Sequence, residues 1–265
     1  MKFVIKLGGS LLESVPAPLD FLKSVVELAQ CGHPVLLAHG GGKLLSQYLQ
    51  RLGIESRFAQ GLRVTDAAAM EVALMVLAGL VNKQVVMAVQ RHGGRAVGLC
   101  GGDARCVRAK KLEPRRADGA PEDLGLVGEV TDIDPAIFDC LFDDRVIPVV
   151  ASIAAAADHT YLNVNADQVA SALASGLVAD RLVYLTDVPG VLDRSGRLIE
   201  RLSLAQADAL VAEGAVSGGM LPKLRACRAA LTKGVPYVCI TQPQALNLAG
   251  GVGGKEPIKG TWIYA

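Results

Sequence analysis

The chain has 265 residues, with 27 Lys and Arg against 26 Asp and Glu, which gives a net charge of +1. This balance provides no global field to attract nucleic acid or an anionic membrane, so any anionic ligand has to be held by local groups. Hydrophobic residues make up 51% of the chain, which is enough for a large core at this length. No uninterrupted apolar run approaches the ~20 residues of a membrane-spanning helix, and we expect a soluble, cytoplasmic protein.

The spacing of cysteine and histidine gives no sign of a metal site. The six cysteines form no CxxC pair, and the four histidines show no metal-ligand spacing with them. We therefore expect free thiols in a reducing cytoplasm and no metal ion held by the protein itself. The cysteines are Cys31, Cys100, Cys106, Cys140, Cys227 and Cys239.

The first segment, Lys2 to Ser10, predicts a short central strand that ends in a pair of glycines. Its apolar residues enclose one lysine, Lys6, and Gly8-Gly9 follows directly. A lysine buried in a sheet costs several kcal/mol unless an anion lies beside it, so Lys6 at the carboxyl end of a strand indicates a bound phosphate or carboxylate. The alternative is a lysine at a frayed strand end that points to water.

The same pattern recurs within the first 53 residues. A helix is predicted over Pro18 to Gln30, a second strand over Pro34 to Ala38, a second glycine loop over His39 to Gly42, and a second helix over Lys43 to Leu52. Right-handed crossovers bring equivalent strand ends together, so both glycine loops are expected at one edge of a parallel sheet. Open α/β sheets bind their ligands at that edge.

The next segment is a connection from Ile54 to Leu62 that leads to a long helix. Thr65 or Asp66 is expected to cap this helix, which runs from Ala67 to Arg91 with apolar residues nearly all round and a soft point at Gly79. One way to bury those apolar residues is a contact between subunits.

A polar, basic segment follows the third predicted strand, Ala96 to Cys100. Its charges and Pro114 indicate that Asp103 to Asp123 forms a solvated β-hairpin or flap outside the core.

Further elements alternate to the end of the chain. Strands are predicted over Val127–Thr131 (an edge strand), Val146–Ser152, Arg181–Thr186, Tyr237–Ile240 and Trp262–Tyr264, and helices over Pro135–Phe142, Gln168–Gly176, Ser203–Gly214 and a stretch from Lys223 to Gly234. Asn163, Asn165 and Asp167 alternate with apolar residues, which places them on one side of an extended segment that enters a helix. They could also simply cap that helix.

The common nucleotide signatures GxxxxGK[ST] and GxGxxG are both absent. Six other motifs occur instead, in the order Lys6–Ser10 (KLGGS), His39–Gly42 (HGGG), Gly61–Thr65 (GLRVT), Asn163–Gln168 (NVNADQ), Asp187–Leu192 (DVPGVL) and Gly219–Lys223 (GMLPK). Together they resemble the amino acid kinase family from Met1 to about Pro243. The resemblance implies a three-layer αβα sandwich with a mainly parallel central sheet, an N-terminal lobe (1–176) for the amino-acid substrate and a C-terminal lobe (177–265) for the nucleotide.

The activity that the resemblance implies is ATP-dependent phosphorylation of the side-chain carboxylate of N-acetyl-L-glutamate, a step of arginine biosynthesis, with Mg²⁺ on the nucleotide phosphates. A longer acylated amino acid such as N-acetylaminoadipate is an alternative substrate, because one methylene is worth only ~1 to 3 kcal/mol of discrimination. A non-catalytic, ligand-binding regulator of the same fold is an alternative of another class.

Three residues match the family's transfer centre. Lys6 and Lys223 are similar to the lysines that stabilise the phosphoryl group in flight, and Asp167 to the carboxylate between them. Phosphoryl transfer needs positioning and charge neutralisation more than a general base. The N–H groups of the loop glycines are expected to line the phosphate path, since glycine allows the closest approach of the backbone. These glycines are Gly8, Gly9, Gly41 and Gly42.

The remaining site residues are also assigned by the resemblance. Arg63 matches a clamp for the substrate carboxylate, Asn163 its partner, and Gly41 and Gly42 border the same substrate; taken alone, Arg63 would be an exposed arginine and Asn163 a turn residue. The nucleotide contacts are expected from Asp187, Val188, Gly190, Val191, Leu192, Ala215, Val216 and Ser217. Two segments depart from the family: the loop Gly101–Asp103 lacks a frequent lysine, and the tail Gly250–Lys259 differs from the usual ending.

The resemblance also carries an expectation about assembly. Arginine-inhibited members of the family have an extra N-terminal helix that ties dimers into a hexameric ring, whereas here Met1 leads directly into the first strand. We therefore expect a homodimer, held largely through the Ala67–Arg91 helix.

Overall fold

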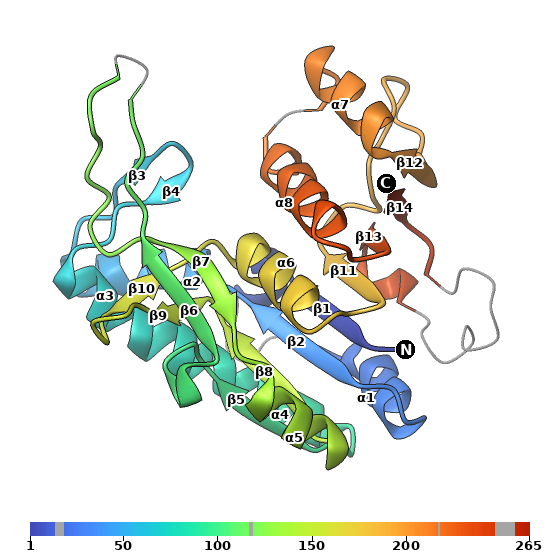
Figure 1. The fold of residues 1–265 in the computed structure, drawn as a ribbon, viewed down its shortest axis with the longest axis horizontal. Helices are drawn as coiled ribbons and strands as arrows, with labels where there is room; N and C mark the ends of the chain where they lie inside the picture. The colour runs from blue at the N-terminus through green and yellow to red at the C-terminus, as the bar shows by residue number, and fades with distance from the viewer. Residues whose placement is uncertain (14–18, 117–118, 217, 247–257) are drawn as a thin grey trace.

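The computed structural model describes residues 1–13, 19–116, 119–216, 218–246 and 258–265. Its centre is an eight-stranded sheet (Figure 1). From one edge to the other its strands are β12 (Arg201–Ser203), β14 (Thr261–Tyr264), β13 (Tyr237–Thr241), β11 (Arg181–Leu185), β1 (Phe3–Leu7), β2 (Val35–His39), β8 (Ile147–Ala151) and β5 (Ala96–Leu99). Only β13 and β14 pair antiparallel among these neighbours, so the predicted mainly parallel sheet is confirmed.

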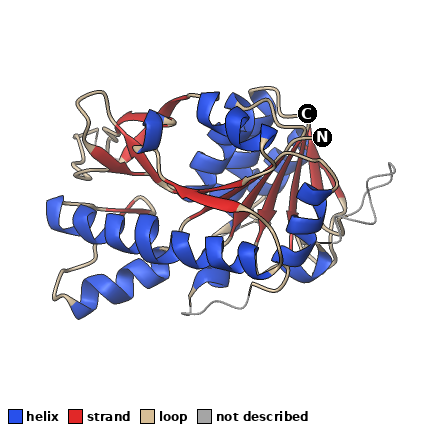
Figure 2. Ribbon diagram, turned by 90° about the horizontal axis from the view of Figure 1, so that it is seen from below, coloured by secondary structure: helices blue, strands red, loops and turns tan. Residues whose placement is uncertain are grey.

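Two helical layers cover the two faces of this sheet, as the view in Figure 2 illustrates. Alternate residues of β1 belong to different cores: Phe3 and Ile5 pack with one set of helices, and Val4 packs with the other. The first set is α1 (Leu22–Gln30), α2 (Gly42–Arg51), α3 (Ala67–Ala73), η2 (Leu74–Val81) and α4 (Asn82–Arg91); the second is α5 (Ala136–Asp143), α6 (Ala166–Gly176), α7 (Leu204–Ala212) and α8 (Met220–Thr232). The three-layer αβα arrangement follows.

Two smaller sheets accompany the central one. A four-stranded sheet has the order β10 (Tyr161–Asn163), β9 (Ile153–Ala155), β6 (Val107–Lys111) and β7 (Gly128–Ile133). A two-stranded hairpin joins β3 (Phe58–Ala59) to β4 (Leu62–Arg63). In Figure 1 this hairpin lies beside the long connection between β6 and β7, and Gln60 Nε2 donates to the Arg115 carbonyl across the two.

The long helix is continuous from Ala67 to Arg91 but changes its winding in the middle. Residues 74–81 around the predicted soft point Gly79 form a π-helix, and Asp66 is the cap, because its side chain accepts from the Ala69 N–H. The helix is long and apolar enough to cross a membrane, yet 56% of its apolar window is buried inside the fold. Its buried side forms part of the core of the fold.

Several predicted boundaries need correction. The segment 103–123 is not wholly outside the core, because Val107 and Ala109 of β6 are buried while Lys110 and Lys111 are exposed; alternation along a strand lets one side pack although the composition is basic. Strands β9 and β12 were not predicted. Helix α1 begins at Leu22 instead of Pro18, and α6 begins at Ala166. Most of the Gly250–Lys259 tail lies outside the described residues.

Candidate active site

Three charged side chains converge at the carboxyl end of β1. Lys6 points to the same face of the sheet as Val4, the face that α6 and α8 cover, and these helices carry Asp167 and Lys223. The Lys6 Nζ lies 2.6 Å from Asp167 Oδ1, and the Lys223 Nζ lies 3.6 Å from Oδ2. The Asp167 carboxylate thus lies between two ammonium groups.

Burial sets the electrostatics of this cluster. Lys6 and Asp167 are each 6% exposed. Burial lowers the pKa of Lys6 and Lys223 lowers it further, against the opposing effect of Asp167. Burial alone would raise the pKa of Asp167, but the charges of Lys6 and Lys223 hold it below its usual value. The carboxylate therefore stays ionised between two cations, and the cluster keeps an excess positive charge for an anion.

The backbone of Asp167 is fixed from both sides. Asn165 caps α6, since its Oδ1 accepts from the N–H groups of Asp167 and Gln168 at 2.9 and 3.2 Å. The buried Tyr184 hydroxyl of β11 donates to the Asp167 carbonyl at 3.1 Å. Asn165 therefore does cap the helix, and in doing so it orients Asp167. No sequence pattern marked Tyr184, because its contact joins two elements that are distant in the chain.

The two glycine loops meet different constraints. A Cβ on Gly8 would lie 2.6 Å from the Leu185 carbonyl oxygen, so β1 leaves the sheet against the end of β11. Gly41 has a φ of +142° and faces Leu77 and Val81 of the long helix. At Gly9 and Gly42 a Cβ would meet no atom within 4 Å, so there is open space beside the Cα atoms of these two residues.

Arg63 and Asn163 line one hollow of about 160 Å³ together with the loop Gly40–Gly42. Phe58 of the β3–β4 hairpin and the start of α6, at Asn165 and Ala166, complete the lining. Ala166, which lines the hollow, directly precedes Asp167 in the chain. The first turn of α6 therefore connects the hollow to the lysine cluster. Helices α2 and α6 both begin at this hollow, and helix N-termini favour anions.

The Arg63 guanidinium is buried and ordered by neutral oxygen atoms. Its Nη2 donates to the Gly42 carbonyl at 2.8 Å and to Ser46 Oγ at 2.7 Å, its Nη1 donates to Ser56 Oγ, and its Cζ lies 4.6 Å from the centre of the Phe58 ring. Burial lowers the pKa of Arg63. Within the described residues no carboxylate pairs with it, so its charge is available to a ligand. Sequence reasoning missed Ser46 and Ser56, for which no motif exists.

Asn163 is held at the other side of the hollow. Its Nδ2 donates to Thr65 Oγ1 at 3.1 Å and its N–H donates to the Leu126 carbonyl. The structure therefore brings together Arg63, Asn163, Gly41 and Gly42, as a shared substrate site requires.

The residues expected at the nucleotide lie at the carboxyl ends of β11 and before α8. Asp187 is exposed, and Gly190 has a φ of +152° where a Cβ would meet Thr261. Val188 and Ala215 are half-buried and Leu192 is 37% exposed, whereas the side chains of Val191 and Val216 are buried in the core. Only the backbone of these two valines is left for a ligand. Ser217 lies outside the described residues.

The described residues contain no group of three or more His, Cys, Asp or Glu side chains that could hold a metal ion. Asp167, the carboxylate at the centre, already faces two ammonium groups. The donor set therefore suits an anion that brings its own metal ion better than a metal site built by the protein.

Similarity to known proteins shows which family the chain belongs to. The profile of the Amino acid kinase family matches residues 1–242. An acetylglutamate kinase of Koribacter versatilis (strain Ellin345) is 48% identical over 250 residues, which are 93% of this chain and 93% of that protein.

Two solved structures share the fold. The structure of smu.665 from Streptococcus mutans UA159 has a TM-score of 0.83 at 28% identity, over 100% of this chain and 98% of that one. N-acetylglutamate synthase from Neisseria gonorrhoeae, complexed with coenzyme A and N-acetyl-glutamate, has a TM-score of 0.81 at 26% identity, over 100% of this chain and 59% of that one. With a family match over nearly the whole sequence and a relative at this identity, the chain belongs to the amino acid kinase family.

Proposed function

We propose that the protein is an ATP-dependent kinase that phosphorylates the side-chain carboxylate of N-acetyl-L-glutamate, as a step of arginine biosynthesis. The observation that carries the proposal is the pair of lysines, Lys6 and Lys223, that face the buried carboxylate of Asp167 beside the Arg63 hollow. The similarity to acetylglutamate kinases supports the same substrate.

In this proposal Lys6 and Lys223 neutralise the charge of the phosphoryl group as it passes from the nucleotide to the substrate. Asp167 offsets the repulsion between the two lysines and sets their directions. A glutamate-type carboxylate in water has a pKa of ~4.3 and is already ionised at pH 7, so the reaction needs no general base.

The substrate would lie in the hollow near Arg63. The guanidinium would bind the α-carboxylate, Asn163 would contact the acylated part of the substrate, and the N–H groups of Gly41 and Gly42 would face the reacting carboxylate. Gly8 and Gly9 would line the phosphate path. These roles divide the chain into a substrate lobe, 1–176, and a nucleotide lobe, 177–265.

ATP would bind to the C-terminal loops, through Asp187, Val188, Gly190, Leu192, Ala215, Ser217 and the backbone of Val191 and Val216. Mg²⁺ would arrive on the nucleotide phosphates, where it supplies charge neutralisation between the phosphate groups. The residues of this chain contribute the lysine charges and the glycine backbone.

Two other functions are separable by experiment. N-acetylaminoadipate differs by one methylene, which a hollow of this kind discriminates weakly. A non-catalytic regulator would have no need of two lysines on one buried carboxylate, and that pair is present.

The test is to trap acyl phosphate with hydroxylamine while the protein is incubated with MgATP and a panel of N-acylated acidic amino acids. We expect N-acetyl-L-glutamate to give the highest kcat/KM. A higher value for N-acetylaminoadipate would change the substrate, and binding of the acylated amino acid without any hydroxamate would favour the regulator.

We further propose a cytoplasmic homodimer that uses the long helix. Met75 and Met87 on this helix are 58% and 59% exposed, which leaves apolar surface for a partner subunit. Light scattering is expected to give the mass of a dimer, and Met75→Glu combined with Met87→Glu is expected to give monomers. A hexamer, or clear inhibition by millimolar arginine, would contradict this proposal.

A further inference from the structure

His39 ends β2 and is only 1% exposed, yet the transfer chemistry gives it no task. Its two ring nitrogens have separate partners. Nδ1 lies 2.8 Å from the carbonyl oxygen of Gly40, and Nε2 lies 3.0 Å from Nδ2 of Asn82, which is itself fully buried on α4. The imidazole thus connects the long helix to the glycine loop of the candidate substrate site.

The chemistry of the partners determines the tautomer. A carbonyl can only accept, so Nδ1 carries the hydrogen. Nε2 then accepts from the Asn82 amide, which also donates to the Val149 carbonyl at 2.8 Å. Burial lowers the pKa of His39 to about 4, so the ring is neutral near pH 7 and both hydrogen bonds persist.

The orientation of Asn82 is fixed as well. Its Oδ1 accepts from Lys83 Nζ at 3.2 Å, and a Cβ on Gly98 would lie only 1.7 Å from that oxygen. Gly98 is therefore the residue that leaves room for the Asn82 amide on β5. The amide cannot exchange its oxygen and nitrogen without facing the Val149 carbonyl with an oxygen.

This chain of contacts acts on one peptide group. In a trans peptide the C=O and the next N–H point in opposite directions. Holding the Gly40 oxygen on the His39 side therefore turns the Gly41 N–H the other way, and within the described residues that N–H has no acceptor. Gly41 borders the hollow that contains Arg63 and Asn163.

We propose that His39, oriented by Asn82, is a positioning residue that holds the Gly40 carbonyl away from the substrate hollow so that the Gly41 N–H faces the anion. A flipped peptide would instead present a carbonyl oxygen to the bound carboxylate, at a site whose function is to bind negative charge. The expected effect on kcat rests on the proposed kinase function. A second measurement, hydrogen exchange of the backbone, does not depend on that function.

Two substitutions separate the two ring contacts. The amide nitrogen of Asn can replace Nδ1, so His39→Asn keeps a donor for Gly40 and loses the acceptor for Asn82. The amide oxygen of Gln can replace Nε2, so His39→Gln keeps the acceptor for Asn82 and loses the donor for Gly40. We expect His39→Asn to retain kcat within about fivefold and His39→Gln to lose about thirtyfold or more.

The thermal stability of the two variants should follow the opposite order to their kcat values. His39→Asn leaves a void and an unpaired Asn82 N–H in the core, so we expect its melting temperature to be lower than that of His39→Gln. A residue with only a structural role would lose activity in step with stability. Equal losses of kcat in the two variants, or a larger loss in His39→Asn, would overturn the inference.

A readout without catalysis keeps the inference separate from the proposed function. Hydrogen exchange of the peptide that contains Gly40 to Leu45, measured by mass spectrometry, is expected to be faster in His39→Gln than in His39→Asn and the unmodified protein. Equal exchange in both variants would contradict the positioning role. If the unmodified protein forms no acyl phosphate, the kinase proposal fails while this measurement still decides the role of His39.

The same two changes at His92 provide the matched control. His92 follows the end of α4, at the other end of that helix from Asn82, and neither substitution there should alter kcat or the exchange of the glycine loop.

Discussion

The lysine cluster and the Arg63 hollow solve the same problem in different ways. Both hold a buried cation for an anionic ligand, but Lys6 faces a carboxylate at 2.6 Å, whereas Arg63 donates to neutral oxygens of Gly42, Ser46 and Ser56. In the lysine cluster a carboxylate compensates the buried positive charge. In the Arg63 hollow the dipoles of neutral oxygen-bearing groups compensate it.

The difference matches what each region is proposed to bind. A phosphoryl group in transit carries charge that must be stabilised for a moment, so two lysines with one carboxylate keep a moderate excess of positive charge. A substrate carboxylate must be bound in the ground state with a fixed orientation. An arginine with its full charge and a planar arrangement of donors suits that task.

Removing a cation from the lysine cluster should have the largest effect. We expect Lys6→Ala and Lys223→Ala each to lower kcat by at least about a hundredfold, while the Kd for N-acetylglutamate changes less than about threefold, because these charges act in the chemical step. Kinetics by hydroxylamine trapping and calorimetric titration give the two numbers.

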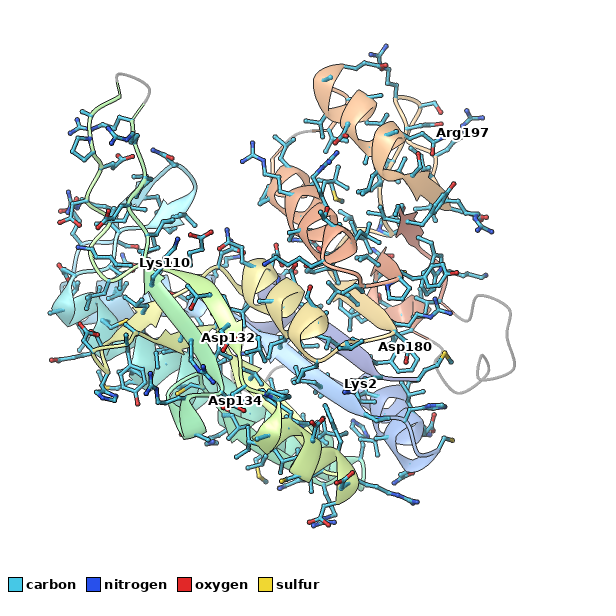
Figure 3. All side chains as sticks on the ribbon, in the orientation of Figure 1. Lys2, Lys110, Asp132, Asp134, Asp180 and Arg197 are labelled. Atoms are coloured by element: carbon cyan, nitrogen blue, oxygen red, sulfur yellow. The ribbon has the colours of Figure 1, made fainter. Side chains whose placement is uncertain are left out.

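The control for these variants is Lys110→Ala. Lys110 is an exposed residue of β6, labelled in Figure 3, and its ion pair is with Glu129, not with the cluster. Its loss should leave kcat unchanged. Turnover near that of the unmodified protein in either cluster variant would remove that lysine from the proposed centre.

The pH dependence of kcat is a second way to distinguish the lysine cluster from the Arg63 hollow. Burial lowers the pKa of Lys6, so we expect kcat to fall as pH rises through that lowered pKa, approaching tenfold per unit beyond it. Folded Lys6 then binds fewer protons than unfolded Lys6, and this residue makes the protein more stable, not less, as pH rises. A fall of kcat that coincides with thermal unfolding, or that persists in an active Lys6→Arg variant, would contradict this assignment.

A substitution in the Arg63 hollow should change substrate binding and leave turnover nearly unchanged. Arg63→Lys keeps a charge but loses the planar arrangement of donors, and we expect KM for N-acetylglutamate to rise about tenfold to thirtyfold with kcat within about threefold. The Kd for the nucleotide serves as the internal control. An unchanged KM together with a large drop in melting temperature would mean that Arg63 has a structural role only.

The smallest effect should come from the neutral oxygens around Arg63. Ser46→Ala removes one acceptor of the guanidinium, and we expect KM to rise about twofold to fivefold, the worth of one hydrogen bond of ~1 kcal/mol. The matched control is Ser195→Ala. Ser195 lies on an exposed loop, and its hydroxyl donates to Asp193. A rise as large as that of Arg63→Lys would show that Ser46 contacts the substrate directly.

Much of this arrangement could be predicted from local sequence. A strand such as β1 carries its apolar residues and glycine exit within nine positions, and two such units imply parallel strands with their loops at one edge. Asp167 and Lys6 were assigned through ordered motifs, and the structure brings them into contact.

What could not be predicted depends on pairs that are distant in the sequence. Tyr184 reaches the Asp167 carbonyl, and Ser56 reaches Arg63, through tertiary packing that leaves no local pattern. The buried side of β6 was missed for a related reason, since its basic composition reflects only the exposed face. Gly79 predicted a soft point in the long helix but not the π-helical winding of residues 74–81.

The central position of β1 has a consequence for how the chain is made. All five of its residues are buried between β2 and β11, but the residue that pairs with Lys6 on one side, Tyr184, is synthesised roughly 180 residues later. At a translation rate of about 5 to 20 residues per second, an apolar strand edge waits for roughly 10 to 35 s. During that interval the nascent chain exposes a strand edge that can pair with other chains.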